Sequence, residues 1–72
     1  MTVEQFRSVC KRKPFKPFTI HTQSGERYEI THPENVWQSG DGETVIVDTS
    51  PEIAIMGIEH ITEVTYKKAK IK

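Results

Sequence analysis

The sequence predicts an α+β domain in which one N-terminal helix packs on a small, bent antiparallel β-barrel of five or six strands. Three observations predict this fold. Apolar residues recur at helical spacing near the start of the chain. From residue 18 onward, apolar and polar residues alternate in short runs. Glycine or proline separates most of these runs, so strands adjacent in sequence are expected to be neighbours in the sheet.

The helix is expected over about residues 3–12. Thr2 and Gln5 fit a capping box, in which each side chain hydrogen-bonds the backbone N–H of the other residue. An apolar stripe follows, formed by Val3, Phe6, Val9 and Cys10. Pro14 disfavours the helical conformation for the residue before it and ends the helix. A helix this short is not stable alone, so its stripe must dock on the remainder of the domain.

A hairpin follows the helix. Residues 18–23 alternate as a half-buried strand, and residues 27–31 alternate as the returning strand. Ser24 and Gly25 form the turn, because glycine adopts the left-handed conformation at little cost. Pro33 ends or kinks the second strand.

The second half of the chain predicts further strands at residues 36–39, 44–48, 52–56 and 62–66, with a short 3₁₀ turn at 58–61. Residues 40–42 are a strong turn signal. Strand 44–48 is rich in β-branched residues and is expected to be the most buried. The predicted core comprises Phe6, Phe18, Ile20, Tyr28, Val45, Val47, Ile61 and Val64. The domain spans residues 1–66, and residues 67–72 form a basic, frayed tail.

A formal net charge of zero conceals an uneven distribution. Residues 1–16 carry a net charge of +4, residues 17–66 carry −8, and residues 67–72 carry +4. The expected β-rich body is therefore acidic and both ends are basic, which bears on any nucleic-acid hypothesis. The single cysteine suits a reducing compartment, and no signal or long apolar run is present, so we expect a cytoplasmic protein without membrane association.

Catalytic and metal-binding patterns are weak. His21, His32 and His60 lack the short spacings typical of metal ligands. Cys10 lies on the apolar stripe, where a buried, inert thiol is common. The carboxylates fall on polar strand positions or in turns, and no nucleophile-type or phosphate-binding glycine-rich loop is present. We therefore expect no enzyme activity, no catalytic residues, no cofactor, no metal site and no small-molecule substrate.

Two groups of residues are candidates for binding a macromolecule. Lys11, Arg12, Lys13 and Lys16, together with the lysine-rich tail, are the candidate contacts for nucleic acid. The acidic body would weaken such binding. Trp37 is followed by the polar residues Gln38 and Ser39 near a turn and is the candidate contact for a protein partner.

Several segments resemble an uncharacterised family of small bacterial proteins. These segments are Pro14–Ile20, Ser24–Tyr28, His32–Glu34, Gly42–Val47 and His60–Val64. The order of expected elements also resembles the Sm-like and SH3-like small barrels. Sm-like proteins form rings and bind RNA, but their RNA-binding positions do not align here, because Asn35 is followed by valine and the strands contain few basic residues.

The sequence favours a non-catalytic binding or interaction module that associates with a protein partner or with itself. The alternative is a nucleic-acid (RNA) binding protein that uses the basic helix end and the tail. These hypotheses differ in their response to salt, because phosphate contacts weaken steeply as salt rises.

Overall fold

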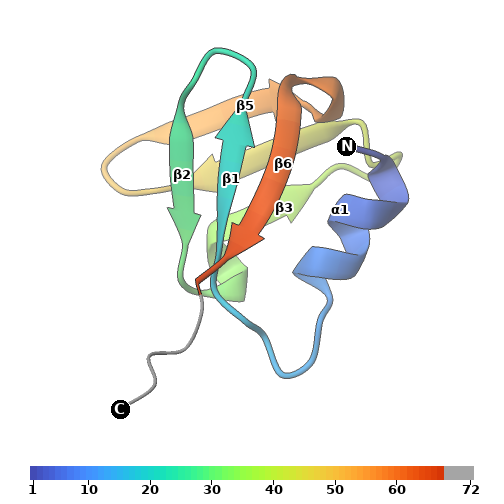
Figure 1. Ribbon diagram of the computed structural model, residues 1–72, viewed down its shortest axis with the longest axis vertical. Coiled ribbons are helices and arrows are strands. Elements are labelled where there is room, and N and C mark those ends of the chain that lie inside the picture. Colours follow the sequence, from blue (N-terminus) through green and yellow to red (C-terminus); the bar gives the residue numbers. More distant parts are fainter. Residues whose placement is uncertain (68–72) are drawn as a thin grey trace.

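The computed structural model describes residues 1–67, so most of the expected basic tail lies outside the described residues. Figure 1 shows a single helix beside strands that run in two directions. In chain order the elements are α1 (Val3–Cys10), β1 (Phe18–Thr22), β2 (Arg27–Ile30), the 3₁₀ helix η1 (Pro33–Asn35), β3 (Val36–Gln38), β4 (Thr44–Asp48), β5 (Ile53–Gly57), the 3₁₀ helix η2 (Ile58–His60) and β6 (Ile61–Tyr66).

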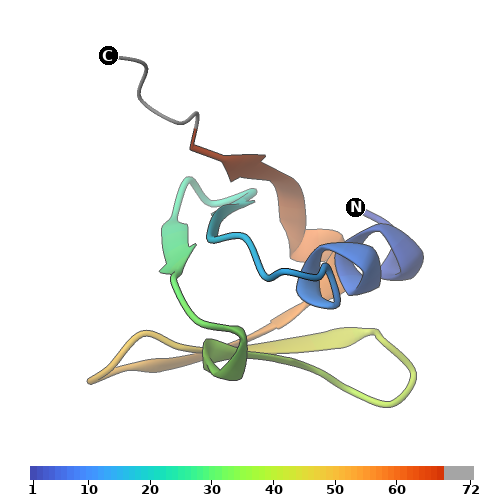
Figure 2. The same cartoon turned by 90° about the horizontal axis from the view of Figure 1, so that it is seen from below.

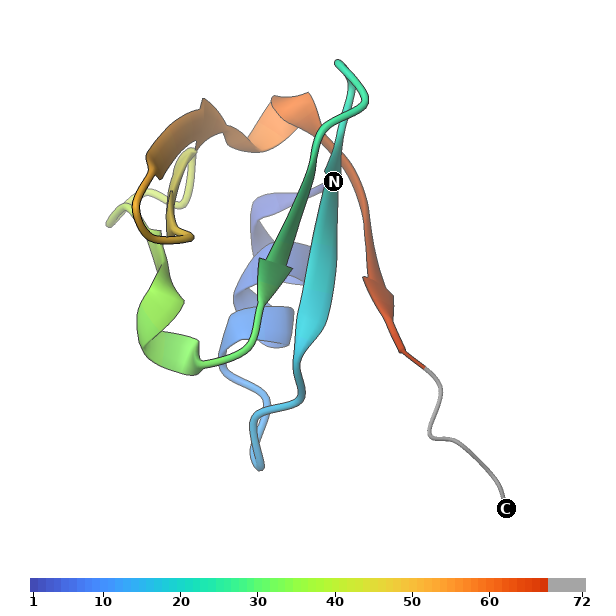
Figure 3. The same cartoon turned by 90° about the vertical axis from the view of Figure 1, so that its left-hand side faces the viewer.

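The strands form two three-stranded antiparallel sheets. The strand order is β2-β1-β6 in the first sheet and β3-β4-β5 in the second. Figure 3 shows the two sheets on opposite sides of the molecule, with α1 between them in that view. The prediction of one helix with antiparallel strands is confirmed, but the hydrogen-bonded ladder is not a closed barrel. The short helices η1 and η2 interrupt it, because 3₁₀ turns carry the chain from one sheet to the other.

Strand neighbours agree with the sequence order only in part. The pairs β1–β2, β3–β4 and β4–β5 are neighbours, as expected. The expectation is wrong for β2 and β3 and for β5 and β6, which lie in different sheets. Instead β6 returns to pair with β1, so Ile20 faces Val64 across the ladder.

The capping box at the start of α1 is confirmed. The backbone N–H of Gln5 donates to Thr2 Oγ1 at 3.1 Å, and the backbone N–H of Thr2 donates to Gln5 Oε1 at 3.0 Å. The helix ends earlier than predicted, at Cys10, because Lys11 leaves the helical conformation with φ −96° and ψ 4°. Phe6 is fully buried and joins α1 to the core.

The core lies between the two sheets and α1. Six of the predicted core residues are buried: Phe6, Phe18, Ile20, Val45, Val47 and Ile61. The prediction was wrong for Tyr28 and Val64, which are only partly buried. Both flank Ile20 from the edge strands β2 and β6, and an edge strand has a neighbour on one side only. Four further residues complete the buried core: Ile30, Val36, Met56 and Ile58.

Candidate functional site

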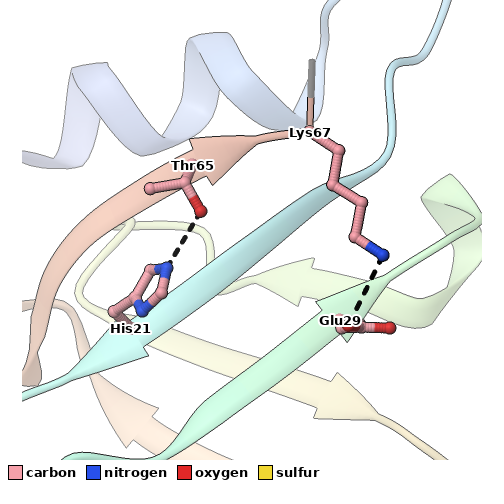
Figure 4. Close-up of polar contacts among 4 residues, drawn as sticks. All are labelled: His21, Glu29, Thr65 and Lys67. Carbon is pink, nitrogen blue, oxygen red and sulfur yellow. Dashed lines mark hydrogen bonds and ion pairs between the residues drawn. The ribbon is translucent and has the colours of Figure 1, made fainter. Parts of the chain in front are cut away.

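The outer face of the β2-β1-β6 sheet is polar. Its cross-strand rows join Thr19 to Glu29 and Thr65, and His21 to Arg27. In Figure 4, His21 Nε2 lies 2.9 Å from Thr65 Oγ1, and Lys67 Nζ lies 3.9 Å from Glu29 Oε2. The ion pair is largely exposed and therefore stabilises the fold little. This face has the composition expected of a sheet surface in contact with water.

The outer face of the β3-β4-β5 sheet is apolar. Trp37, Ile46 and Ile55 form one row across the three strands, and Ile53 lies two positions before Ile55 on the same face. The side chains of Trp37, Ile53 and Ile55 are 48%, 65% and 70% exposed. We call Trp37, Ile46, Ile53 and Ile55 the outer patch. In Figure 2, where this sheet is seen from its edge, no drawn segment covers its lower side.

The inner face of the same sheet determines which residues form the outer patch. Val45 and Val47 on β4 are fully buried, so Ile46 between them points outward. On β5, Met56 is buried and Ala54 is partly buried, so the isoleucines beside them point outward. Residues that pair across neighbouring strands point to the same face of the sheet. The register therefore places the outward residues of β5 beside the outward residues of β4.

Asp48 is the only charged residue at an outward position of β3, β4 or β5, and it lies at the end of β4. Its Oδ1 atom accepts a hydrogen bond from the backbone N–H of Ser50 at 3.0 Å, which turns the carboxylate toward the following loop. The outer patch itself therefore carries no charge. In a chain with 28% charged residues, such a face differs from ordinary surface.

A groove of about 500 Å³ separates the C-terminal half of α1 from β3. Arg7 and Cys10 of α1 and Lys11, which caps the helix, line one wall, and five consecutive residues, 36–40, line the other. No aspartate or glutamate belongs to this lining. Lys11 and Trp37, which the sequence suggested for two different partners, therefore line one groove.

The remaining residues of the basic group lie elsewhere. Arg12 Cζ lies 5.3 Å and Lys16 Nζ 4.9 Å from the ring centroid of Tyr66, within the range of cation–π interaction. Lys13 is exposed. The basic group is therefore divided between the groove and the surface around Tyr66, and within residues 1–67 none of its members forms an ion pair with an acidic side chain.

Cys10 is a poor nucleophile in this position. Burial raises the pKa of its thiol to about 11, so the thiol stays protonated at neutral pH. His21 and His60 contact hydroxyl groups, with His60 Nε2 lying 3.3 Å from Ser24 Oγ. Within residues 1–67 no three histidine, cysteine, aspartate or glutamate side chains gather closely enough to bind a metal ion.

A second hollow, of about 490 Å³, lies between β2 and the loop that follows β4. Its charged residues are Arg27, Glu29, Asp48 and Glu52. Tyr28 also lines this hollow, and its pKa is raised by desolvation and by its hydrogen bond to Glu26. Acidic groups predominate over the one arginine, and this hollow suits neither phosphate nor a carboxylate ligand.

The sequence identified Trp37 as a candidate contact, but it did not identify the exposed residues Ile53 and Ile55 or the half-buried Ile46 beside them. A signal for them exists, because strand segments 45–47 and 53–56 are apolar in both phases of the alternation. Such runs predict apolar side chains on both faces of the sheet, which is typical of strands that are covered on both sides. Arg7 was also missed as a groove residue, because only the fold places it opposite β3.

No helix within the described residues is long and apolar enough to cross a membrane. Comparison with known proteins gives no relative: no protein-family model, curated protein or solved structure matches this chain.

Proposed function

We propose that this chain is a non-catalytic interaction module that associates with a second copy of itself through the outer patch. The observation that supports this proposal most is the uncharged row of Trp37, Ile46 and Ile55 on one sheet face. Burial of exposed apolar side chains releases about 25 cal/mol for each Å² removed from water. Contiguous apolar surface of this kind is typical of interaction sites rather than of free surface.

A second copy is the partner that fits this face best. Two copies of the outer patch, which carries no charged side chain, can pack face to face without bringing like charges of the patch together. The formal net charge of zero adds no overall repulsion between copies. A two-fold arrangement places the same four residues on both sides of the interface.

The proposal extends to the fold family. The order of elements, with η2 before β6 and β6 paired to β1, supports a relation to the Sm-like and SH3-like small barrels. The chain would then be a small barrel in which no hydrogen bonds join the two sheets, so that β3 and β5 have free edges. A soluble, cytoplasmic protein is part of the same proposal.

Solution mass measured by light scattering over a range of concentrations tests the self-association. The variant Ile53→Thr/Ile55→Thr removes apolar surface but keeps β-branched residues in β5. We expect the wild-type mass to rise with concentration toward that of a dimer and the variant to stay monomeric. The matched control, Glu29→Thr/Glu63→Thr, changes outward residues of β2 and β6 and should still associate. A wild-type chain that stays monomeric at millimolar concentration, or a variant that associates equally well, would contradict the proposal.

Nucleic-acid binding is the second candidate function, and the exposure of the basic group favours it. Lys11, Arg12, Lys13 and Lys16 are all exposed at the C-terminal end of α1 and in the loop that follows. The strands add Arg27 amid many acidic residues, so phosphate contacts would come from the basic group. Such binding should weaken steeply as salt rises.

A further inference from the structure

We propose that the groove between α1 and β3 binds an extended acidic peptide segment, which adds to the free edge of β3. This site goes beyond the proposed self-association, because it takes a different kind of partner and shares only Trp37 with the outer patch. Three observations support it: the open edge of β3, the spacing of Arg7 and Lys11, and the absence of acidic residues from the groove lining.

The first observation is the free edge of β3. β3 pairs only with β4, so its other side has no strand partner among the described residues. The backbone N–H of Ser39 donates to the carbonyl of Thr44 at 2.8 Å, which fixes the alternation of the antiparallel ladder. The backbone N–H and C=O groups of Trp37 then face β4, whereas those of Val36 and Gln38 face the free edge.

The second observation is the charge of the opposite wall. Arg7 lies on α1 and Lys11 caps its C-terminus, and both line the groove. The backbone N–H of Lys11 donates to the carbonyl of Arg7 at 3.0 Å, so the two residues are one helical turn apart. One turn rises about 5.4 Å. Alternate residues of an extended peptide repeat at about 6.6 Å. Two acidic side chains at alternate positions of an extended peptide therefore match the two cations.

The guanidinium of Arg7 lies beside the β3–β4 hairpin, because an added Cβ at Gly42 would lie 3.0 Å from Arg7 Nη2. Gln38 Nε2 donates to the carbonyl of Val3 at 3.3 Å and to the carbonyl of Gly42 at 3.1 Å. The first of these hydrogen bonds connects the start of α1 to the same hairpin. The wall that carries the cations is thus attached to the end of β3.

The chemistry of the β3 edge favours a peptide over a nucleic acid. The edge offers both donors and acceptors from the backbone of Val36 and Gln38, and a peptide backbone satisfies both kinds of group. A phosphodiester backbone offers acceptors only. Arg12 and Lys16, which would add to a phosphate path, lie over Tyr66 rather than in the groove.

Trp37 is the only tryptophan in the chain and lines the groove, so its fluorescence responds to a peptide bound there. The probe is an acetylated and amidated octapeptide of alternating glutamate and valine, and the control is the same peptide with lysine in place of glutamate. We expect the glutamate peptide to change the Trp37 emission and to shift the amide resonances of Val36 and Gln38. Substitution Lys11→Glu should weaken binding about tenfold, because it removes one attraction and adds one repulsion. The matched control Lys13→Glu, outside the groove lining, should weaken it less.

Two N-methylated peptides test strand addition without changing the protein. One carries N-methyl groups on all valines and the other on all glutamates. Because only alternate N–H groups of an added strand face the edge, one peptide should lose binding and the other should keep it. Equal binding of both N-methylated peptides, equal binding of the lysine peptide, or no binding at millimolar concentration would overturn the proposal. Binding of an oligouridylate in the groove without binding of the glutamate peptide would also overturn it.

The same titrations on the Ile53→Thr/Ile55→Thr variant separate this inference from the proposed self-association. Both substitutions lie outside the groove lining. Peptide binding retained in that variant would support the groove even if the wild-type chain is monomeric. Peptide binding lost in that variant alone, with its fold unchanged, would assign the peptide to the outer patch and overturn the groove proposal.

Discussion

The rings of Phe6 and Phe18 meet edge to face, with centroids 6.3 Å apart and planes inclined at 88°. This contact joins the helix to the first strand of the first sheet. Phe18 also contacts the ring of Tyr66 at 6.5 Å, which extends the aromatic contact to the end of β6. The three rings therefore connect the beginning and end of the described chain.

Replacement of Phe6 with alanine should lower the free energy of unfolding by about 3 kcal/mol or more, because a fully buried aromatic ring leaves a cavity. Urea denaturation followed by Trp37 fluorescence measures the change. Thr2→Ala is the reference: it removes one cap at an exposed helix end and should cost about 1 kcal/mol or less. Equal losses in the two variants would show that α1 does not dock through Phe6.

Gly42→Ala should destabilise the fold more than Gly25→Ala. Both glycines have positive φ, +80° and +88°, which costs an L-residue about 1 kcal/mol or more. Only at Gly42 would the new Cβ collide with the side chain of Val3, whereas at Gly25 no atom lies within 4 Å. The difference between the two free energies of unfolding measures the close approach of α1 to the hairpin. Equal costs would mean that Val3 moves aside freely.

Cys10 should react slowly with iodoacetamide at neutral pH. The raised pKa, about 11, keeps the thiol protonated in the folded chain, and the thiolate is the reactive form. The urea-unfolded chain serves as the control and should react faster. The pKa is raised by burial, so its contribution to stability is fully present below the unfolded pKa of about 9 and is lost as pH rises toward about 11. Equal alkylation rates in the folded and unfolded chains would contradict this account.

The carboxyl group of Asp41 should titrate below its ordinary pKa. Its Oδ1 atom accepts the backbone N–H of Glu43 at 3.0 Å and the Ser39 hydroxyl at 2.7 Å, and these hydrogen bonds lower the pKa. The contribution to stability is present above the unfolded pKa and is lost as pH falls through the folded value. NMR titration of wild type and Ser39→Ala measures the effect, and we expect the variant to titrate at higher pH. An unchanged pKa of Asp41 in the variant would show that the serine hydroxyl does not lower it.

Substitution of Lys11, Arg12, Lys13 and Lys16 by glutamine tests nucleic-acid binding. All four side chains are exposed, so the fold should be unchanged by circular dichroism. If the wild type binds RNA, the variant should lose binding, and wild-type binding should weaken steeply between 50 and about 200 mM salt. Salt-resistant RNA binding that survives this substitution would require a site on the strands instead.

The helix, the hairpins and most of the core could be predicted from the sequence, because each depends on short-range patterns. The capping box depends on residues three positions apart, and the predicted burial of Val45 and Val47 is confirmed. The partial exposure of Trp37 was also expected, and it is 48% exposed. These features can be predicted without knowing which residues distant in the sequence are in contact.

The sheet arrangement and the candidate site depend on long-range contacts that local patterns do not contain. The return of β6 to β1 brings together residues more than forty positions apart, such as His21 and Thr65. The groove likewise requires α1 to lie along β3, which places Lys11 near Trp37. The apolar run over residues 53–56 indicates apolar side chains on both faces of β5, but it does not show that one of these faces has no cover among the described residues.

Because β1 lies between β2 and β6, the first sheet is complete only when the last strand of the chain is present. A nascent chain that has emerged only as far as β5 holds the β3-β4-β5 sheet complete but leaves one edge of β1 unpaired. Premature termination before Ile61 would therefore leave β1 as an open edge strand, a template for aggregation rather than half of a working domain.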